Sequence, residues 1–177
     1  MKNVKRTLLS ISAMVVLGSA GATTAQSKNV TLWNGELQLT VPKTSGNAKK
    51  ISSTLYSIQP TSKKMRVVLY ASREPIRADE KSLTNAQLGA SIKTLLESQG
   101  YKVTKFKTKS NTFTTNLAGN TKMPWRKVGT ASVLGMAQFV RTSQGQLVGT
   151  FMLSDPKEWK KTSTRAYRTA VTKSKVK

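Results

Sequence analysis

The chain has 177 residues with no Cys and no His, and 30 Lys and Arg residues against seven Asp and Glu give it a formal net charge of +23. The absence of Cys and His excludes thiol nucleophiles, Ser-His-Asp hydrolysis and nearly every zinc or copper site that proteins commonly use. The excess of positive charge favours anionic partners and salt-sensitive binding, but it is equally compatible with a role in solubility alone.

The first segment, residues 1–25, has the pattern of a secretory signal peptide. Its basic start, residues 2–6, precedes an apolar run over residues 8–17 that is too short to span a bilayer. Cleavage after Ala22 or after Ala25 fits the small residues that follow, and we favour the second position. The alternative for this segment is an uncleaved membrane anchor. A lipid-anchored lipoprotein is excluded because no Cys follows the apolar run.

The remainder, residues 26–177, is predicted to be one soluble domain in the periplasm or outside the cell. Three of the basic residues belong to the N-terminal segment, so the remainder carries a net charge near +20. A chain of about 150 residues suffices for a single core that buries roughly 70% of the surface of the unfolded chain. Without Cys, its stability depends on core packing and not on disulfides, even in an oxidising compartment.

The N-terminal part of this domain is predicted to consist of strands. Residues 30–33 and 36–41 flank Asn34-Gly35, which is the strongest two-residue signal for a β-hairpin. The second of these segments alternates apolar and polar side chains, as a half-buried strand does. Two further strands are expected over residues 51–59 and 65–72.

A helix is predicted over residues 83–99. Thr84 and Gln87 have the spacing of a capping box, and Gly100 stands where a left-handed residue commonly ends a helix. The strand that follows, residues 101–109, alternates Lys with apolar residues imperfectly, which indicates a bulge or an edge position guarded by lysine. The helix presents an apolar stripe of Leu88, Ile92, Leu95 and Leu96.

The C-terminal part ends in the clearest strand and helix of the chain. Residues 110–124, rich in Asn and Thr, are expected to form a long surface loop, and strands are expected over residues 125–130 and 133–141. The final strand, residues 146–153, carries apolar residues on both faces, as a central strand of a covered sheet does. A helix is expected to start at Asp155-Pro156. One face of this helix would carry Trp159, Ser163, Ala166, Ala170 and Ser174.

This order of elements predicts an α+β fold in which one antiparallel sheet packs against two helices. The strand Leu37–Pro42, the helix after the third strand, and the ending Phe151–Pro156 with Trp159 resemble the PsbP-like family, which also includes the DcrB-like periplasmic proteins of bacteria. The resemblance implies a PsbP-like α/β/α sandwich and a small secreted or envelope protein, commonly a non-enzymatic binding or assembly factor. The metal binding of the photosynthetic members is not expected, because this chain lacks His.

Two patterns could carry chemistry, and both have a simpler explanation. Ser154 and Lys157 have the Ser-x-x-Lys spacing of serine acyl enzymes, but the helix start explains this segment and no partner motif is present. Glu74, Asp79 and Glu80 could act as acid and base or bind a hard cation, yet they lie in a charged connection before a helix, where the helix dipole favours acids. We therefore expect no catalytic activity, no metal and no cofactor.

Basic residues form two groups that the fold could bring together into an anion-binding surface. One group follows residues 101–109 and continues around Trp125, and the other covers the outer face of the last helix. Cations with aromatic rings nearby suit an anionic polymer or anionic lipid headgroups, whereas nucleic acid is not expected for a secreted protein. The alternative is a solvated helix face, a lysine-guarded edge strand and a tryptophan in the core. The candidate residues are Lys102, Lys105, Lys107, Lys109, Lys122, Arg126, Lys127, Lys157, Lys161, Arg165 and Arg168.

The predicted function is that of a non-catalytic binding or accessory protein whose basic surface engages an anionic envelope or extracellular partner. The rival prediction is an assembly factor that docks on an envelope protein through an exposed groove, with the charge serving solubility only. The salt dependence of binding separates these predictions, because only the first requires the charge.

Overall fold

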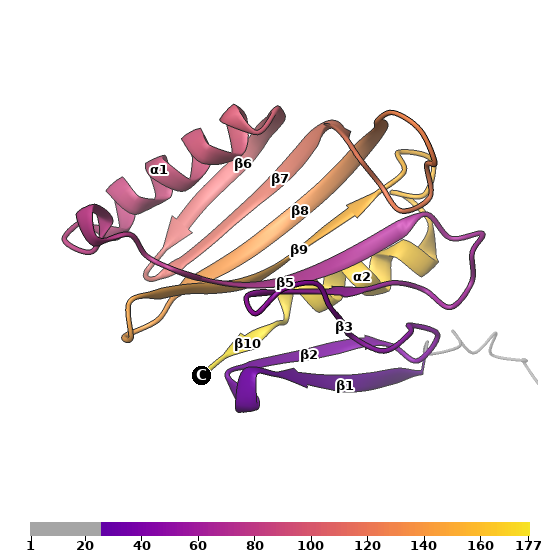
Figure 1. Ribbon diagram of the computed structural model, residues 1–177, viewed down its shortest axis with the longest axis horizontal. Coiled ribbons are helices and arrows are strands. Elements are labelled where there is room, and N and C mark those ends of the chain that lie inside the picture. The colour runs from indigo at the N-terminus through magenta and orange to yellow at the C-terminus, as the bar shows by residue number, and fades with distance from the viewer. Residues whose placement is uncertain (1–25) are drawn as a thin grey trace, which may run out of the picture.

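The computed structural model describes residues 26–177, and the predicted signal peptide lies outside this range. The strands are β1 (Ser27–Leu32), β2 (Leu37–Pro42), β3 (Lys49–Lys50), β4 (Leu55–Ile58), β5 (Val67–Pro75), β6 (Tyr101–Lys109), β7 (Thr112–Thr121), β8 (Ala131–Arg141), β9 (Gln146–Ser154) and β10 (Lys175–Val176), and the helices are α1 (Asn85–Ser98) and α2 (Thr162–Thr172). They form an antiparallel seven-stranded sheet of order β3-β4-β5-β9-β8-β7-β6 and a smaller sheet of order β1-β2-β10 (Figure 1). The expected α+β fold class is confirmed.

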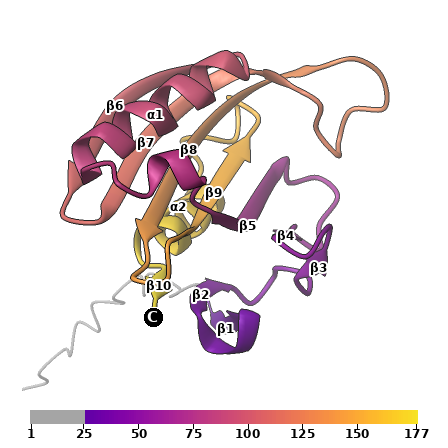
Figure 2. The ribbon, with the colours of Figure 1, turned by 60° about the vertical axis from the view of Figure 1, so that its left-hand side comes forward.

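Strand β9 lies at the centre of the larger sheet, between β5 and β8, as its two apolar faces predict. Helices α1 and α2 lie on opposite sides of this sheet (Figure 2). On the α2 side, Val148 and Met152 are fully buried. On the α1 side, Leu147 and Phe151 remain only half-buried. Helix α1 therefore covers its face of the sheet incompletely.

The larger core lies between the two sheets, around α2. Tyr167 and Val171 of α2 pack with Leu39 of β2, Leu69 of β5 and Met152 of β9, and all five side chains are buried. Full burial of an apolar side chain of this size stabilises a fold by about 1.5–3 kcal/mol. The amphipathic last helix is thus the element that joins the small sheet to the large one.

The predicted N-terminal hairpin is present, but its turn spans four residues. Trp33 and Asn34 adopt left-handed φ angles of 48° and 54°, and Leu32 pairs with Leu37. The Arg73 guanidinium lies 5.4 Å from the centre of the Trp33 ring and 3.0 Å from the Glu36 carboxylate. These contacts fasten the hairpin to β5.

The local signals around α1 are confirmed. The Thr84 and Gln87 side chains form the expected capping box, and Gly100 has a φ of +86°. Strand β6 lies at the edge of the sheet. Its pairing with β7 shifts register between Thr104 and Lys107, with Lys105 at a φ of +53°, so both the edge and the bulge are present.

The expected loop over residues 110–124 is wrong, since most of it forms β7. This strand pairs along its length with β6 and β8, and Phe113, Thr115 and Leu117 are buried at every second position. Threonine has high strand propensity, and the Thr115 hydroxyl donates a 3.0 Å hydrogen bond to the Thr104 carbonyl. The buried Thr115 hydroxyl therefore has a hydrogen-bond partner, so a segment rich in polar residues can form a strand inside the sheet.

The strand expected over residues 125–130 and the helix start at Asp155-Pro156 are also wrong. The first segment forms turns and bends, with Gly129 at a φ of +73°. After β9, the Asp155 carboxylate accepts a 2.9 Å hydrogen bond from the Lys157 amide, but the chain then makes successive tight turns. Helix α2 begins only at Thr162.

A contact between α2 and the preceding turn accompanies this later start. The Arg168 guanidinium donates to the Trp159 carbonyl, which a helix continuing from Pro156 would have used for its own backbone bonds. The buried face of α2 accordingly consists of Thr164, Tyr167, Ala170 and Val171, whereas the expected face shared only Ala170 with it.

Candidate functional site

Cations from both predicted basic groups line a shallow hollow of about 480 Å³. The connection between β7 and β8 supplies Arg126 and Lys127, and the segment after β9 supplies Lys157. Arg66, just before β5, and the half-buried Trp125 complete its wall. The fold therefore places three of the candidate anion-binding residues around one tryptophan.

Positive charge in this hollow exceeds negative charge. Its single carboxylate, Asp155, forms an ion pair with Arg66 at 3.3 Å. Within residues 26–177, no carboxylate side chain forms an ion pair with Arg126, Lys127 or Lys157. Four cations and one carboxylate line the hollow, so its net charge is +3. Such a concavity can hold a phosphate, sulfate or carboxylate group.

The remaining candidate residues lie outside the hollow. Arg165 is exposed on α2, and Lys161 binds the Glu158 carboxylate at 2.7 Å. The Arg168 guanidinium is stacked 5.1 Å from the centre of the Trp159 ring and is partly buried there. Lys161 and Arg168 thus already have local partners. The residues exposed on β6 and just after β7 are Lys102, Lys105, Lys107, Lys109 and Lys122.

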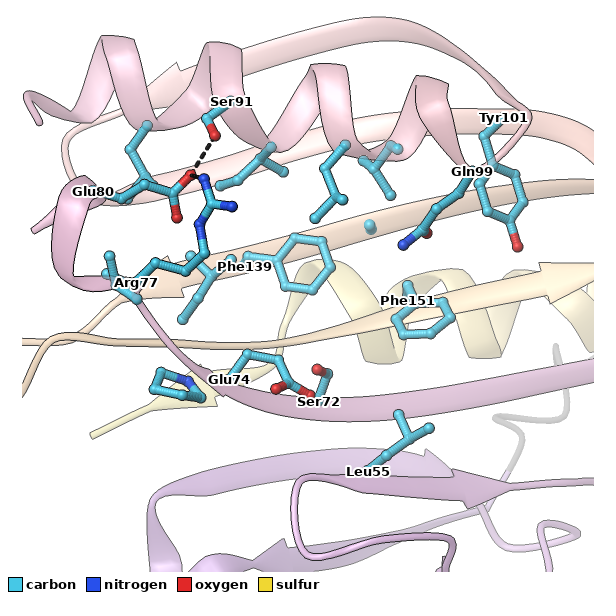
Figure 3. Close-up of a pocket in the computed structure, with 18 of the residues that line it drawn as sticks. Leu55, Ser72, Glu74, Arg77, Glu80, Ser91, Gln99, Tyr101, Phe139 and Phe151 are labelled. Carbon is cyan, nitrogen blue, oxygen red and sulfur yellow. Dashed lines mark hydrogen bonds and ion pairs between the residues drawn. The ribbon is translucent and has the colours of Figure 1, made fainter.

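A second concavity, a groove of about 600 Å³, lies between α1 and the larger sheet (Figure 3). Phe139 of β8 and Phe151 of β9 lie on its sheet side. Leu95 of α1, 57% exposed, borders it on the helix side. Tyr101 lines one part of the groove and Leu55 of β4 another. Its volume is within the range of about 300–1,000 Å³ that small-molecule sites occupy.

The groove exists because α1 packs towards one edge of the sheet. Leu88 and Ile92 bury themselves against Phe113 of β7 and the neighbouring β6. The α1-facing side of β8 and β9 is left without a helix above it, so Phe139 and Phe151 stay half-exposed. An amphipathic helix about 10 Å wide covers roughly two strands spaced about 4.8 Å apart. A seven-stranded sheet is wider than one such helix.

The aromatic side chains of the groove contact each other and one further ring, that of Tyr70. Tyr70 of β5 stacks on Phe151 with ring centres 4.8 Å apart, and Phe139 lies 6.5 Å from Phe151. Burial, and to a lesser extent the neighbouring Tyr101, raises the pKa of Tyr70 above its usual value. The Tyr70 hydroxyl is therefore neutral at physiological pH.

The charged residues of the groove are mainly acidic. Glu74, Glu80 and Arg77 line it (Figure 3). Arg77 binds Asp79 at 3.4 Å and Glu80 at 3.3 Å, and the Ser91 hydroxyl donates to the Glu80 carboxylate. All seven acidic residues of the chain lie within residues 26–177, and Glu74 is the one that forms no ion pair there.

The two side chains of the Ser-x-x-Lys pattern lie in different environments. Ser154 is fully buried, while Lys157 is exposed. Residues 26–177 hold no group of three or more Asp and Glu side chains placed to share a metal ion. Within the same range, neither helix has the length and apolar character that crossing a membrane requires.

The groove was not predicted from the sequence. The available signals were Leu95, an apolar stripe residue that the structure leaves exposed, and the alternation on β5 that places Ser72 and Glu74 on the same face as Phe151. These signals indicate a site only when the order of the strands and the position of α1 over the sheet are known.

No protein-family model matches this chain, and no curated protein sequence matches it. The fold is nevertheless shared with solved structures. The Ran-binding protein Mog1p of Saccharomyces cerevisiae superposes with a TM-score of 0.55 at 13% identity, over 86% of this chain and 96% of that one. Cyanobacterial PsbP (CyanoP) from Synechocystis sp. PCC 6803 superposes with a TM-score of 0.52 at 18% identity, over 91% of this chain and 99% of that one. The expected PsbP-like fold is confirmed.

Proposed function

We propose that this protein is a non-catalytic binding protein of the cell envelope or exterior, whose cationic hollow engages an anionic partner. In this proposal residues 1–25 direct export and are removed, and residues 26–177 act as one domain. The partner presents phosphate, sulfate or carboxylate groups, as an anionic polymer or anionic lipid headgroups do. The observation that carries the proposal is the convergence of Arg126, Lys127 and Lys157 beside Trp125 without ion-pair partners among residues 26–177.

The chemistry of these side chains supports this partner class. A guanidinium such as that of Arg126 can donate two parallel hydrogen bonds to one phosphate or carboxylate. The Lys127 and Lys157 ammonium groups add point charges at the ends of flexible chains. A repeated anion would gain from several such contacts, and displaced counterions would make its binding fall with salt.

The test is binding of residues 26–177 to dextran sulfate and to vesicles containing phosphatidylglycerol across a salt series. The triple variant Arg126→Glu/Lys127→Glu/Lys157→Glu is expected to bind at least about tenfold more weakly at low salt. The slope of the logarithm of the binding constant against the logarithm of the salt concentration should become shallower by about two. Each lost contact with a polyanion removes about 0.7–0.9 from this slope. The matched control is Lys102→Glu/Lys107→Glu/Lys109→Glu on β6, which changes the net charge equally and should lose much less.

Equal losses in the two triple variants would contradict the proposal, because binding would then follow net charge and not the hollow. Absence of binding by the unaltered protein at physiological salt would contradict it as well. A second candidate, docking on a protein partner with charge serving solubility only, is supported by the Ran-binding protein Mog1p, which has the same fold. This second candidate predicts that both triple variants still bind the protein partner.

A further inference from the structure

The groove under α1 differs in charge from the rest of the molecule. Its lining carries two carboxylates, Glu74 and Glu80, against one guanidinium, Arg77. Residues 26–177 as a whole carry a net charge near +20. A local net charge of −1 is therefore an exception on this surface, and it coincides with the larger of the two concavities.

Glu74 is the group that remains available to a ligand. The Arg77 guanidinium already contacts Asp79 and Glu80, so these three side chains largely satisfy one another. Glu74 is exposed and forms no ion pair with another side chain of residues 26–177. In Figure 3 it lies beside Ser72 at the β5 side of the groove.

The neighbouring cation cannot reach Glu74 without leaving other contacts. Arg73 adjoins it in sequence, but alternation along β5 turns Arg73 to the opposite face of the sheet. There it binds Glu36 at 3.0 Å and stacks over Trp33. Glu74 thus lacks this partner because of the strand geometry. A change of the Arg73 side-chain rotamer alone would not bring the two groups together.

Aromatic rings supply apolar surface near this carboxylate and add a weaker attraction for positive charge. Phe139, Phe151 and Tyr101 line the groove, and the face of an aromatic ring attracts organic cations, more strongly where water is excluded. The apolar surface around these rings suits the hydrocarbon part of a ligand.

We propose that this groove binds a small organic cation with an apolar body, namely an alkyl- or aryl-ammonium compound. The ammonium group contacts the Glu74 carboxylate, and the apolar body lies on Phe139 and Phe151 beside Leu95. The volume of about 600 Å³ fits a ligand of this size. This site is separate from the cationic hollow, because the two share no lining residue.

The test compares two amphiphiles with the same type of chain and opposite head groups, decyltrimethylammonium and decanoate, each below its micelle concentration. Methyl NMR of residues 26–177 would follow Leu55, Leu95, Leu96 and Leu147, which line the groove. Decyltrimethylammonium is expected to shift these methyl signals saturably and to bind at least about fivefold more tightly than decanoate. This preference would oppose the overall charge of the protein, so general electrostatic attraction cannot produce it.

Substitutions isolate the carboxylate. Glu74→Gln is expected to weaken decyltrimethylammonium binding about fivefold, as loss of a partly exposed ion pair does. The matched control is Glu97→Gln, which makes the same chemical change on α1 outside the groove lining and should change the dissociation constant less than twofold. Glu74→Lys should reverse the preference in favour of decanoate.

Three results would overturn the proposal. They are equal or tighter binding of decanoate, equal weakening by Glu74→Gln and Glu97→Gln, and shifts in methyl groups away from the groove. Glu74 is exposed and unpaired among the described residues, so its substitution is expected to leave the unfolding midpoint unchanged. The variant Leu95→Lys, at a position 57% exposed on the helix side of the groove, should also weaken binding of the cation and provides a second measurement.

Discussion

One buried hydrogen bond ties the C-terminal helix to the segment after β2. The Tyr167 hydroxyl lies 2.8 Å from the Ser45 hydroxyl, across 122 positions of sequence. Tyr167 is fully buried and Ser45 is 2% exposed. Neither hydroxyl has another hydrogen-bond partner among the described side chains and backbone groups. Removing one hydroxyl therefore leaves the other buried and unpaired.

The size of the effect follows from this arrangement. Leaving a buried hydroxyl without a partner costs about 1–3 kcal/mol, whereas removing both partners can be nearly neutral. Tyr167→Phe and Ser45→Ala should each lower the free energy of unfolding by about 1–3 kcal/mol. The double variant should lie within about 1 kcal/mol of the unaltered protein, so the two losses should fail to add by at least about 1 kcal/mol.

Urea unfolding of residues 26–177 at neutral pH measures these values, provided that the denaturant slope is the same in all four proteins. A double variant whose loss equals the sum of the two single losses would refute the reasoning, because the hydroxyls would then not be coupled. Single variants with the stability of the unaltered protein would refute the assigned burial.

Two further predictions concern the central sheet. Gly149→Ala should lower stability by about 1–3 kcal/mol in urea unfolding, because the added methyl group would meet the Gln138 carbonyl and the Phe139 Cα of the adjacent strand; Gly46→Ala, with one contact at 3.3 Å, should cost less. Burial raises the pKa of Tyr70 above about 10, so the folded state holds this proton after the unfolded chain has released it. Stability should fall as the pH rises from about 10 towards the folded pKa, and Tyr70→Phe should make that fall shallower; an unchanged slope would contradict it.

Local signals in the sequence predicted those parts of the fold that depend on neighbouring residues. The capping box at Thr84 and the left-handed Gly100 define the two ends of α1, and both involve contacts within one turn of the chain. The two apolar faces of β9 predicted its central position for a similar reason. A strand with apolar residues on both faces must be buried on both faces, whichever elements pack against it.

The failed predictions depend on partners distant in sequence. The Thr and Asn residues of β7 read as a loop because nothing nearby shows that Thr115 would find a backbone carbonyl of β6. The start of α2 was misplaced because the Asp155-Pro156 pattern opens a series of turns instead of a helix. The contact of Arg168 with the Trp159 carbonyl, nine positions away, is not visible in that local pattern. The two-residue β10, which pairs with β2, has no periodicity of its own to detect.

The candidate sites were predictable to different extents. Composition and clustering pointed to Arg126, Lys127 and Lys157 among eleven candidates, but only the fold distinguishes these three from the lysines of β6. The groove arises from the offset of α1 over the sheet, which no local pattern specifies. Proteins that share this fold at 13–18% identity need to share its buried positions, while the residues that line surface concavities remain free to differ.

The opposite charges of the two concavities follow from how the few acids of this chain are distributed. A carboxylate among so many cations would ordinarily find a partner, as the other six do. Glu74 remains unpaired because Arg73 is held on the other face by Glu36, and because Arg77 is occupied by its own neighbours. A strongly basic protein can thus keep one acidic groove by engaging the nearest cations elsewhere. Substitution at Lys157 and at Glu74 should therefore change anion and cation binding separately.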